Sequence, residues 1–449
     1  MQKMTLREIA DACGGQFVGD AALLDDFAHD IKIDSRAVKQ GDLFIAVKGE
    51  RLDGHDYIDS ACENGAMCII TEKAIDQTPS IRVASTFAAL KDIAEYYRVK
   101  MDKKVVAITG SVGKTTAKEM IALVLAQKFD VMKTAGNFNN EFGLPQTIFR
   151  IEPHHDVAVV EMGMSGFGEI RNLSRIAKPD VAVIMNIGES HIGNLGSRDG
   201  IFAAKCEIFE HCQDGALAVL NGDDDKLATL ERDGAVFFGR GSNDVSVQQI
   251  IKADMRGTEF VADVFGEAMT LFIPKPGEYL IYPALAAAAI GKRMGLTGVQ
   301  IRRGIAEFVP VGMRMDVINT GRITIINDAY NACKQSMLAG AGTLKFADGR
   351  KVAILGDILE LGEFGPDIHF ETGRLLGSLG LDLIICVGKL ARHMADGAEK
   401  TSAGKVRYYE TQAALFEQLD TLITVGDTVF VKASRGMRFE NIVEKLGEL

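Results

Sequence analysis

Short runs of apolar residues recur through the middle of the chain and alternate with longer stretches of helical spacing. Nearly every position in these runs is apolar, whereas a strand with one solvated face would alternate apolar and polar residues. Such runs lie at residues 105–109, 156–161, 180–186 and 216–221. The pattern predicts an α/β fold with a central, mostly parallel sheet that helices cover on both faces.

The same pattern resumes after a junction at residues 309–315, which contains Pro310 and Gly312. The later apolar runs lie at residues 323–328, 352–357, 383–388 and 428–432. Each run leads into a polar residue or a glycine, so one edge of this sheet should carry functional groups. We predict a C-terminal domain of dinucleotide-fold type, and the absence of G-x-G-x-x-G argues against a bound nicotinamide.

The N-terminal stretch predicts a small α/β domain with a helix at residues 6–13 and a strand at 42–47. Its loops carry Ser, Arg, Asp and His residues, which either bind a polar anionic ligand or are solvated without one. Residues 242–273 predict an antiparallel extension of the middle sheet, and residues 284–294 predict an alanine-rich helix. Because 449 residues exceed one core, we expect three domains. Their predicted limits are residues 1–100, 101–311 and 312–449.

Composition and charge narrow the possible partners. The net charge of −11 argues against a nucleic-acid or anionic-membrane surface, and no apolar run is long enough to cross a bilayer. Seven cysteines without a C-x-x-C pair suit reduced thiols better than disulfides or structural zinc. We therefore expect a cytoplasmic protein without a membrane span, and we expect it to be monomeric.

The stretch from Val105 to Thr116 predicts an ATP site. An apolar strand breaks into the turn Thr-Gly-Ser-Val-Gly-Lys-Thr-Thr, and helix-forming residues follow it. Gly110 and Gly113 allow backbone N–H groups to face an anion, Lys114 supplies a cation for the β- and γ-phosphates, and the next hydroxyl suits Mg²⁺. Ile108 stands where the general phosphate-loop pattern has glycine, so the loop is a shorter form.

Polar residues follow the next strands of the middle domain, where α/β sheets place their ligands. Glu161 ends one predicted strand, and a carboxylate beside a phosphate loop suits Mg²⁺. Asn186 and His191 follow another strand, and the histidine is either a metal ligand or a supporting core residue. Lys205 lies in the next predicted helix, and by itself it reads as a helix-surface lysine.

A loop rich in asparagine lies at residues 136–145, after the phosphate-loop helix, and ends in a proline. Asparagine tolerates turn geometry, so a tight loop without ligand is one interpretation. The alternative is that the amides face whatever group meets the γ-phosphate.

These motifs together resemble the Mur ligases. The resemblance rests on T-G-S-V-G-K-T-T, G-N-F-N-N at 136–140, E-M-G at 161–163, N-I-G-E-S-H at 186–191, D-A-Y-N at 328–331 and G-D-I-L-E-L-G at 356–362. D-S-R and G-D-L-F-I-A-V-K-G near the N-terminus extend it along nearly the whole chain. An N-terminal G-x-G-x-x-G and a D-N-P-R signature are both absent. Within the family, these absences favour a ligase that adds D-alanyl-D-alanine.

The resemblance implies an ATP- and Mg²⁺-dependent amide ligase of peptidoglycan precursor synthesis. Such an enzyme phosphorylates the terminal carboxylate of UDP-N-acetylmuramoyl-tripeptide, and the amine of D-alanyl-D-alanine attacks the acyl phosphate. A family member that adds diaminopimelate or lysine is an alternative, and so is a phosphate-loop protein that binds ATP only as a switch.

The resemblance also implies roles for particular residues. Thr115 and Glu161 hold one metal, His191 helps to hold a second, and Lys205 carries the carbamate that supports it. The implied nucleotide contacts are Thr109, Gly110, Ser111, Val112, Gly113, Lys114, Thr115, Thr116, Arg314, Asp328 and Asn331. The implied contacts to the uridine nucleotide are Ser35 and Arg36, those to the sugar-peptide are Asn137, Asn139 and Asn140, and those to the dipeptide are His369, Lys432 and Arg435.

The sequence departs from the family pattern at two places. An H-N-x-x-N pattern, whose first asparagine contacts adenine, is replaced by Tyr279-Leu-Ile-Tyr-Pro283. D-A-Y-N-A-N-P becomes Asp328-Ala-Tyr-Asn-Ala-Cys-Lys334. Neither change touches the phosphate or metal groups, so we expect adenine to be held differently in the same kind of site.

Overall fold

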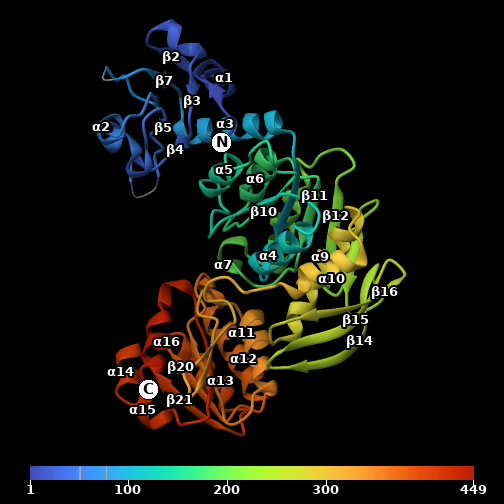
Figure 1. Ribbon diagram of the computed structural model, residues 1–449. Helices are drawn as coiled ribbons and strands as arrows, with labels where there is room; N and C mark the ends of the chain where they lie inside the picture. The colour runs from blue at the N-terminus through green and yellow to red at the C-terminus, as the bar shows by residue number, and fades with distance from the viewer. Residues whose placement is uncertain (50–51, 77) are drawn as a thin grey trace.

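The computed structural model describes residues 1–49, 52–76 and 78–449. Figure 1 shows three successive parts: a blue N-terminal part, a green and yellow middle part, and an orange to red C-terminal part. Each is built around its own sheet, within residues 16–82, 104–273 and 316–432. The predicted three-domain α/β fold is therefore confirmed, whereas the domain limits at 100/101 and 311/312 stay predictions.

The N-terminal sheet has the strand order β2-β7-β6-β5-β4. The predicted helix and strand are present as α1 (Leu6–Ala12) and β5 (Leu43–Ile45). Thr5 and Glu8 form a capping box that fixes the first turn of α1. The other elements are β1 (Met4–Thr5), β2 (Gln16–Val18), β3 (Phe27–Ala28), β4 (Ile31–Lys32), α2 (Ile58–Glu63), β6 (Cys68–Thr71), β7 (Ser80–Arg82) and the connecting α3 (Thr86–Met101).

The middle sheet has the order β16-β15-β14-β13-β12-β11-β8-β10-β9. Alternate residues of β8 (Lys104–Thr109) enter different cores: Val105 and Ala107 pack with residues of α3 and α6, while Val106 and Ile108 pack with α4 and α9. This burial on both faces explains the uninterrupted apolar runs. The parallel strands are β8, β9 (Val131–Lys133), β10 (Val157–Glu161), β11 (Val181–Ile184), β12 (Leu217–Asn221) and β13 (Val236–Gly239).

The predicted antiparallel extension is also present. It consists of β14 (Val245–Asp254), β15 (Gly257–Val264) and β16 (Glu267–Ile273). The helices of this domain are α4 (Lys114–Leu125), α5 (Gly143–Ile148), α6 (Glu169–Ala177), α7 (Ile192–Leu195), α8 (Arg198–Cys206), α9 (Ile281–Arg293) and α10 (Gly298–Ala306). The asparagine-rich loop is shorter than predicted, because α5 begins at Gly143 and includes Pro145 near its start.

The C-terminal sheet has the order β17-β18-β22-β19-β20-β21 and is parallel except for β17. The predicted strands are β18 (Thr324–Asn327), β19 (Lys351–Gly356), β20 (Leu383–Val387) and β22 (Thr428–Lys432). The edge strands β17 (Asp316–Asn319) and β21 (Lys405–Tyr409) were not predicted, because much of each is exposed and mixes polar with apolar residues. The helices are α11 (Lys334–Ala341), α12 (Gly365–Gly377), α13 (Ala391–Ala398), α14 (Gln412–Phe416), α15 (Leu419–Leu422) and α16 (Glu440–Gly447).

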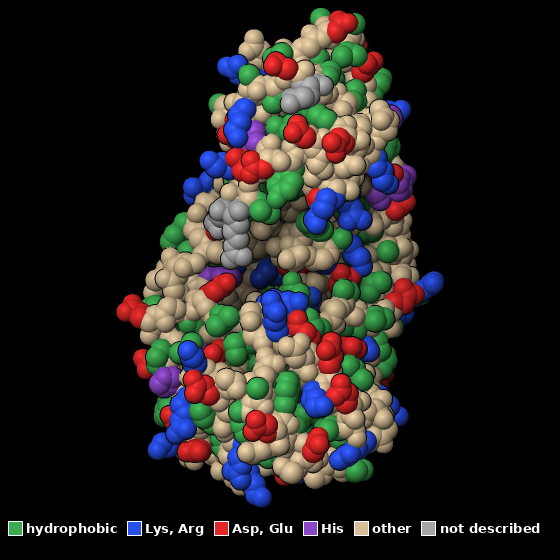
Figure 2. All heavy atoms as spheres, turned by 90° about the vertical axis from the view of Figure 1, so that its left-hand side faces the viewer, with side chains coloured by type: hydrophobic (Ala, Val, Ile, Leu, Met, Phe, Trp, Pro, Cys, Tyr) green, Lys and Arg blue, Asp and Glu red, His purple; other side chains and the backbone are tan. Residues whose placement is uncertain are grey.

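The middle and C-terminal domains meet along the ends of their parallel strands. A cavity of about 850 Å³ lies between them, lined by the residues after β8, β10 and β11 on one side and those after β18 on the other. Figure 2 shows one face of the molecule hollowed near its centre, with Lys and Arg side chains gathered around the hollow. Within residues 1–49, 52–76 and 78–449, no helix has the length and apolar character needed to cross a membrane.

Candidate active site between the middle and C-terminal domains

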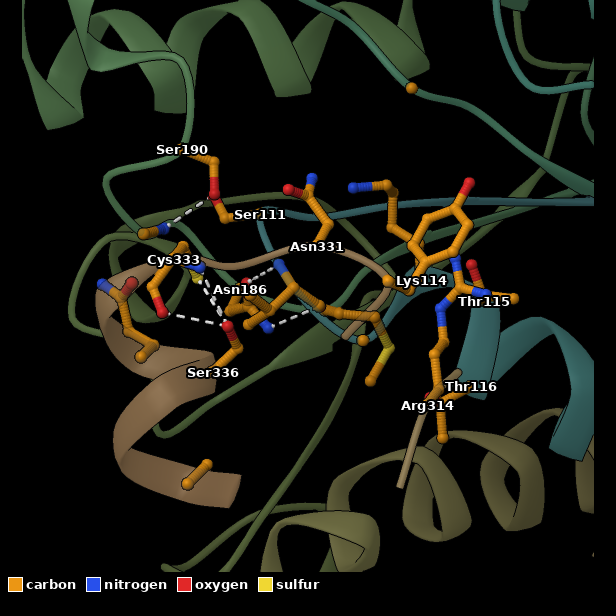
Figure 3. Close-up of a pocket in the computed structure, with 18 of the residues that line it drawn as sticks. Ser111, Lys114, Thr115, Thr116, Asn186, Ser190, Arg314, Asn331, Cys333 and Ser336 are labelled. Atoms are coloured by element: carbon orange, nitrogen blue, oxygen red, sulfur yellow. Dashed lines mark hydrogen bonds between the residues drawn. The ribbon is translucent and has the colours of Figure 1, made fainter. Parts of the chain in front are cut away.

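The phosphate loop connects β8 to the start of α4. Gly110 and Gly113 have φ values of +152° and +81°. Residues other than glycine rarely adopt such backbone conformations. Asn186 fixes the loop, because its Oδ1 accepts from the N–H of Val112 and its Nδ2 donates to the carbonyl of Val112, both at 2.9 Å. Figure 3 shows Asn186 in the same pocket as the loop residues Ser111, Lys114 and Thr115. The loop is thus held open toward the cavity at the N-terminus of α4.

Lys114 lies over this loop. Its Nζ donates to the carbonyl of Gly110 at 2.7 Å, and its side chain lines the cavity. Burial lowers the pKa of Lys114, and Glu161 opposes that shift. A polyphosphate bound in the cavity would place negative charge beside this ammonium group and so stabilise its charged form.

Glu161 ends β10 and joins two parts of the site. Its Oε2 accepts from the hydroxyl of Thr115 and its Oε1 accepts from Nδ2 of Asn139, both at 2.8 Å. The residue is only 3% exposed. Hydroxyl, carboxylate and amide oxygens are the ligands that Mg²⁺ prefers, so these residues fit that ion.

His191 and Lys205 occupy different positions relative to the cavity. His191 lines it with a strained φ of +63°, and its Nδ1 lies 2.6 Å from Oε2 of Glu360 in the C-terminal domain. Lys205, on α8, is 2% exposed, so its interpretation as a surface lysine is wrong. Burial, and then the charge of Lys114, hold the pKa of Lys205 well below its usual value. A lowered pKa makes the proton easier to lose, and the unprotonated amine is the form that reacts with carbon dioxide.

The C-terminal domain contributes a second wall. The Arg314 guanidinium lies over the ring of Tyr330, 3.7 Å from its centroid. Asp328 forms an ion pair with Lys432, and both are nearly buried. Burial raises the pKa of Asp328 while Lys432 opposes the rise. Asn331 also lines the cavity (Figure 3), so the structure brings these residues to the phosphate loop.

Other residues singled out in the sequence have different surroundings. Asn137 and Asn140 line the cavity, and Oδ1 of Asn140 also accepts from the N–H of Gly143 at the start of α5. Ser35 is buried in the N-terminal domain, and the Arg36 side chain is 87% exposed beside Asp34. The structure does not bring this pair to the cavity between the other two domains.

His369 and Arg435 also lie outside the lining of the cavity. His369 has no exposed surface, its Nε2 accepts from the N–H of Ile358, and its Nδ1 contacts the carbonyl of Gly365. Both ring nitrogens are therefore occupied, which corrects the prediction of a direct contact to a dipeptide. Arg435 is half exposed and pairs with Glu440.

Several cavity residues were not assigned a role from the sequence. They include Asp223, Tyr279, Tyr282, Cys333 and Glu360. Tyr279 and Tyr282 were noticed only as part of a departure from a family pattern, and Glu360 only as part of G-D-I-L-E-L-G. Asp223 lies two residues after the end of β12, so its place near a strand end was an available signal.

Comparisons with known proteins agree with this geometry. The Mur ligase family catalytic domain matches residues 28–108, the Mur ligase middle domain matches 108–291, and the Mur ligase glutamate ligase domain matches 313–435. The UDP-N-acetylmuramoyl-tripeptide–D-alanyl-D-alanine ligase of Bacillus subtilis (strain 168) is 36% identical, with 100% of this chain and 99% of the relative covered. The enzyme of the same name from Escherichia coli (strain K12) is 32% identical with the same coverage.

Solved structures give the same result. A crystal structure of MurF from Acinetobacter baumannii has a TM-score of 0.94 at 32% identity, with both chains fully covered. MurF ligase from Thermotoga maritima, solved in complex with ADP, has a TM-score of 0.83 at 31% identity, with 93% of this chain and 97% of that chain covered. Because the similarity extends over the full length in both sequence and structure, this chain belongs to the Mur ligase family.

Proposed function

We propose that this protein is an ATP-dependent ligase that joins D-alanyl-D-alanine to UDP-N-acetylmuramoyl-tripeptide in the cytoplasm. The observation that carries the proposal is the contact of Glu161 with both Thr115 and Asn139 beside the phosphate loop. It supports a metal and a substrate carboxylate meeting at the γ-phosphate. The names of the Bacillus subtilis and Escherichia coli relatives support this choice of substrates.

The reaction takes two steps. The terminal carboxylate of the tripeptide attacks the γ-phosphate and releases ADP, and the dipeptide amine then attacks the acyl phosphate and releases phosphate. Two anions must approach each other in the first step, so positive charge is required between them. Lys114 and the N-terminus of α4 hold the β- and γ-phosphates, while Thr115 and Glu161 would hold Mg²⁺. When bound there, such an ion would supply positive charge to the transferred phosphoryl group.

His191 and Lys205 would support a second metal in this proposal. Lys205 would do so as its carbamate, which agrees with a pKa that burial and then the charge of Lys114 lower. Asn137, Asn139 and Asn140 contact the sugar-peptide, and Ser35 and Arg36 contact the uridine nucleotide from the N-terminal domain. Arg314, Asp328 and Asn331 contact the nucleotide from the C-terminal side.

The proposed dipeptide site lies in the C-terminal domain. Lys432 and Arg435 lie in the C-terminal domain, and Arg435 keeps an exposed guanidinium that suits the dipeptide carboxylate. Lys432 is bound to Asp328 and acts through that residue. The seven cysteines are free thiols, which fits a reducing compartment. We propose that the active form is a monomer.

One assay tests the proposal. Phosphate release is measured with ATP, UDP-N-acetylmuramoyl-tripeptide and D-alanyl-D-alanine, and each component is omitted in turn. Release that requires all three, with the pentapeptide product identified by mass spectrometry, supports the proposal. Release that depends instead on diaminopimelate or lysine with a UDP-linked dipeptide identifies another ligase. Slow release that no amine accelerates identifies a switch protein.

A further inference from the structure

A segment of the middle domain and a segment of the C-terminal domain touch beside the cavity. A Cβ at Gly193, in α7, would lie 3.0 Å from the backbone nitrogen of Gly362 and 3.2 Å from the carbonyl oxygen of Glu360. A side chain at residue 193 would crowd this contact, whereas glycine allows the two backbones to approach closely. The segments that carry His191 and Glu360 are therefore packed backbone to backbone.

His191 and Glu360 both have an unusual backbone conformation. Their φ values are +63° and +65°, in the left-handed region that residues with a side chain seldom occupy. Such strain persists only where the surrounding structure imposes it, and it is frequent at functional sites. Both residues also line the cavity, although they belong to different domains. The fold therefore accepts strain on both sides of one contact in order to bring these two residues together.

The side chains of the two residues meet at one nitrogen of the imidazole ring. Nδ1 of His191 lies 2.6 Å from Oε2 of Glu360. This nitrogen is shielded from solvent, and no other group of the described residues is placed to bond it. An ionised carboxylate only accepts, so Nδ1 carries the proton in this contact. Nε2 is then the nitrogen of the neutral ring that keeps a free lone pair.

A histidine that binds a metal through one ring nitrogen commonly donates its other N–H to a carboxylate, which fixes the orientation of the ring. The contact between His191 and Glu360 has this form. We propose that Glu360 is a positioning residue, which holds the His191 ring so that Nε2 is available to the second metal. This inference rests on the proposed ligase function. It extends that function by giving a role to a residue of the C-terminal domain in a site on the middle domain.

The effect of removing Glu360 follows from this role. Loss of a carboxylate that orients a metal-binding histidine typically lowers metal affinity or activity by about 10- to 100-fold. The Glu360 side chain is 61% exposed, so its replacement should leave the core of the domain intact. Alanine and glutamine both keep a Cβ, so the backbone strain at residue 360 is the same in both variants. We therefore expect folded variants that differ from wild type in metal affinity.

The test measures binding of Mn²⁺ to the full chain with ADP and bicarbonate, from the electron paramagnetic resonance signal of the free ion. Wild type should bind two ions, and Glu360→Ala should bind the weaker one roughly 10- to 100-fold less tightly. Glu360→Gln should have an intermediate affinity, because its amide oxygen still accepts from Nδ1. Glu363→Ala, which changes an exposed glutamate of the same segment, is the matched control and should bind as wild type does.

Another variant separates positioning from a contact that only holds the domains together. Lys334→Ala removes the ion pair with Glu189, which also joins the two domains. Positioning predicts a larger loss of Mn²⁺ affinity in Glu360→Ala than in Lys334→Ala, and equal losses would overturn the inference. Wild type that binds a single Mn²⁺, or Glu360→Ala that binds both ions normally, would also overturn it. Absence of amide product from wild type instead contradicts the proposed ligase function, because these binding measurements need no turnover.

Discussion

The hydroxyl of Thr115 donates a hydrogen bond of 2.8 Å to Oε2 of Glu161, and this contact links the phosphate-loop helix to the neighbouring strand. In the proposed reaction the same two oxygens would hold Mg²⁺, because hydroxyl and carboxylate oxygens suit that ion. The contact holds the two ligands close together before the ion enters.

Glu161→Gln should reduce kcat/KM by about 100-fold or more, because a neutral amide replaces the carboxylate that binds the cation. Thr115 and Asn139 retain a partner of the same size, so the thermal unfolding midpoint should change little. Titration of the rate with Mg²⁺ is the measurement, and the variant should require more of the ion. Glu399→Gln, on the exposed surface, is the control. An unchanged Mg²⁺ requirement would remove Glu161 from the metal site.

Lys114→Ala should also reduce ligation by roughly 100- to 1,000-fold, because a cation that faces the γ-phosphate is lost while the backbone loop remains. Circular dichroism should show an intact fold. Lys128→Ala, an exposed lysine just beyond the same helix, should keep its activity. Near-normal turnover of Lys114→Ala would contradict the assignment of the ATP site.

Lys205→Ala should be nearly inactive, and acetate or formate in the buffer should restore part of the rate by replacing the missing carbamate. Lys205→Met keeps an apolar chain of similar length in the same buried position, and we expect it to be folded and equally inactive. Lys445→Ala, on the surface of α16, should be active without any rescue. Full activity of Lys205→Ala would mean that the buried amine has no role in the reaction.

The sequence predicts much of the fold because burial on both faces leaves a simple pattern. The central strands β8, β10 and β11 have apolar interiors, and their ends mark the places where ligands bind. The short strand β9 and the half-exposed β21 carry no such pattern, so they were missed. The start of α5 was missed because a proline reads as a loop signal, although proline is tolerated in the first turn of a helix.

Some residues of the candidate site could likewise be predicted from the sequence, and others could not. Residues fixed by a local motif, such as Lys114 and Glu161, line the cavity as expected. The ring of His369 instead bonds to the backbone at both nitrogens, a tertiary arrangement that no sequence spacing reveals. The burial of Lys205 also depends on packing around α8, so a lysine that reads as exposed in the sequence is enclosed in the fold.

The middle and C-terminal domains should move closer to each other when the substrates bind. Nζ of Lys334 in the C-terminal domain lies 3.2 Å from Oε1 of Glu189 in the middle domain, and each side chain is about one fifth exposed, at 22% and 20%. Pro310 and Gly312 lie in the connection between the domains, and Gly312 has a φ of +66°. Closure of this kind would protect an acyl phosphate from water.

We expect small-angle scattering to give a smaller radius of gyration with ATP and tripeptide than without them. Arg314→Ala should weaken the effect and raise the KM for ATP, because the C-terminal wall then loses its cation. Identical dimensions in both states, together with an unchanged dependence on ATP in Arg314→Ala, would rule out closure.

Charge reversal directly tests the ion pair that Lys334 and Glu189 form between the two domains. Lys334→Glu should raise the KM for ATP by roughly fivefold, which corresponds to about 1 kcal/mol, because two carboxylates then face each other in the closed form. Combining it with Glu189→Lys should recover most of the loss, since the pair is restored with its charges exchanged. Lys445→Glu, which disrupts an exposed pair within one domain, should leave KM unchanged. Additive effects of the two interdomain changes would show that the pair does not stabilise the closed arrangement.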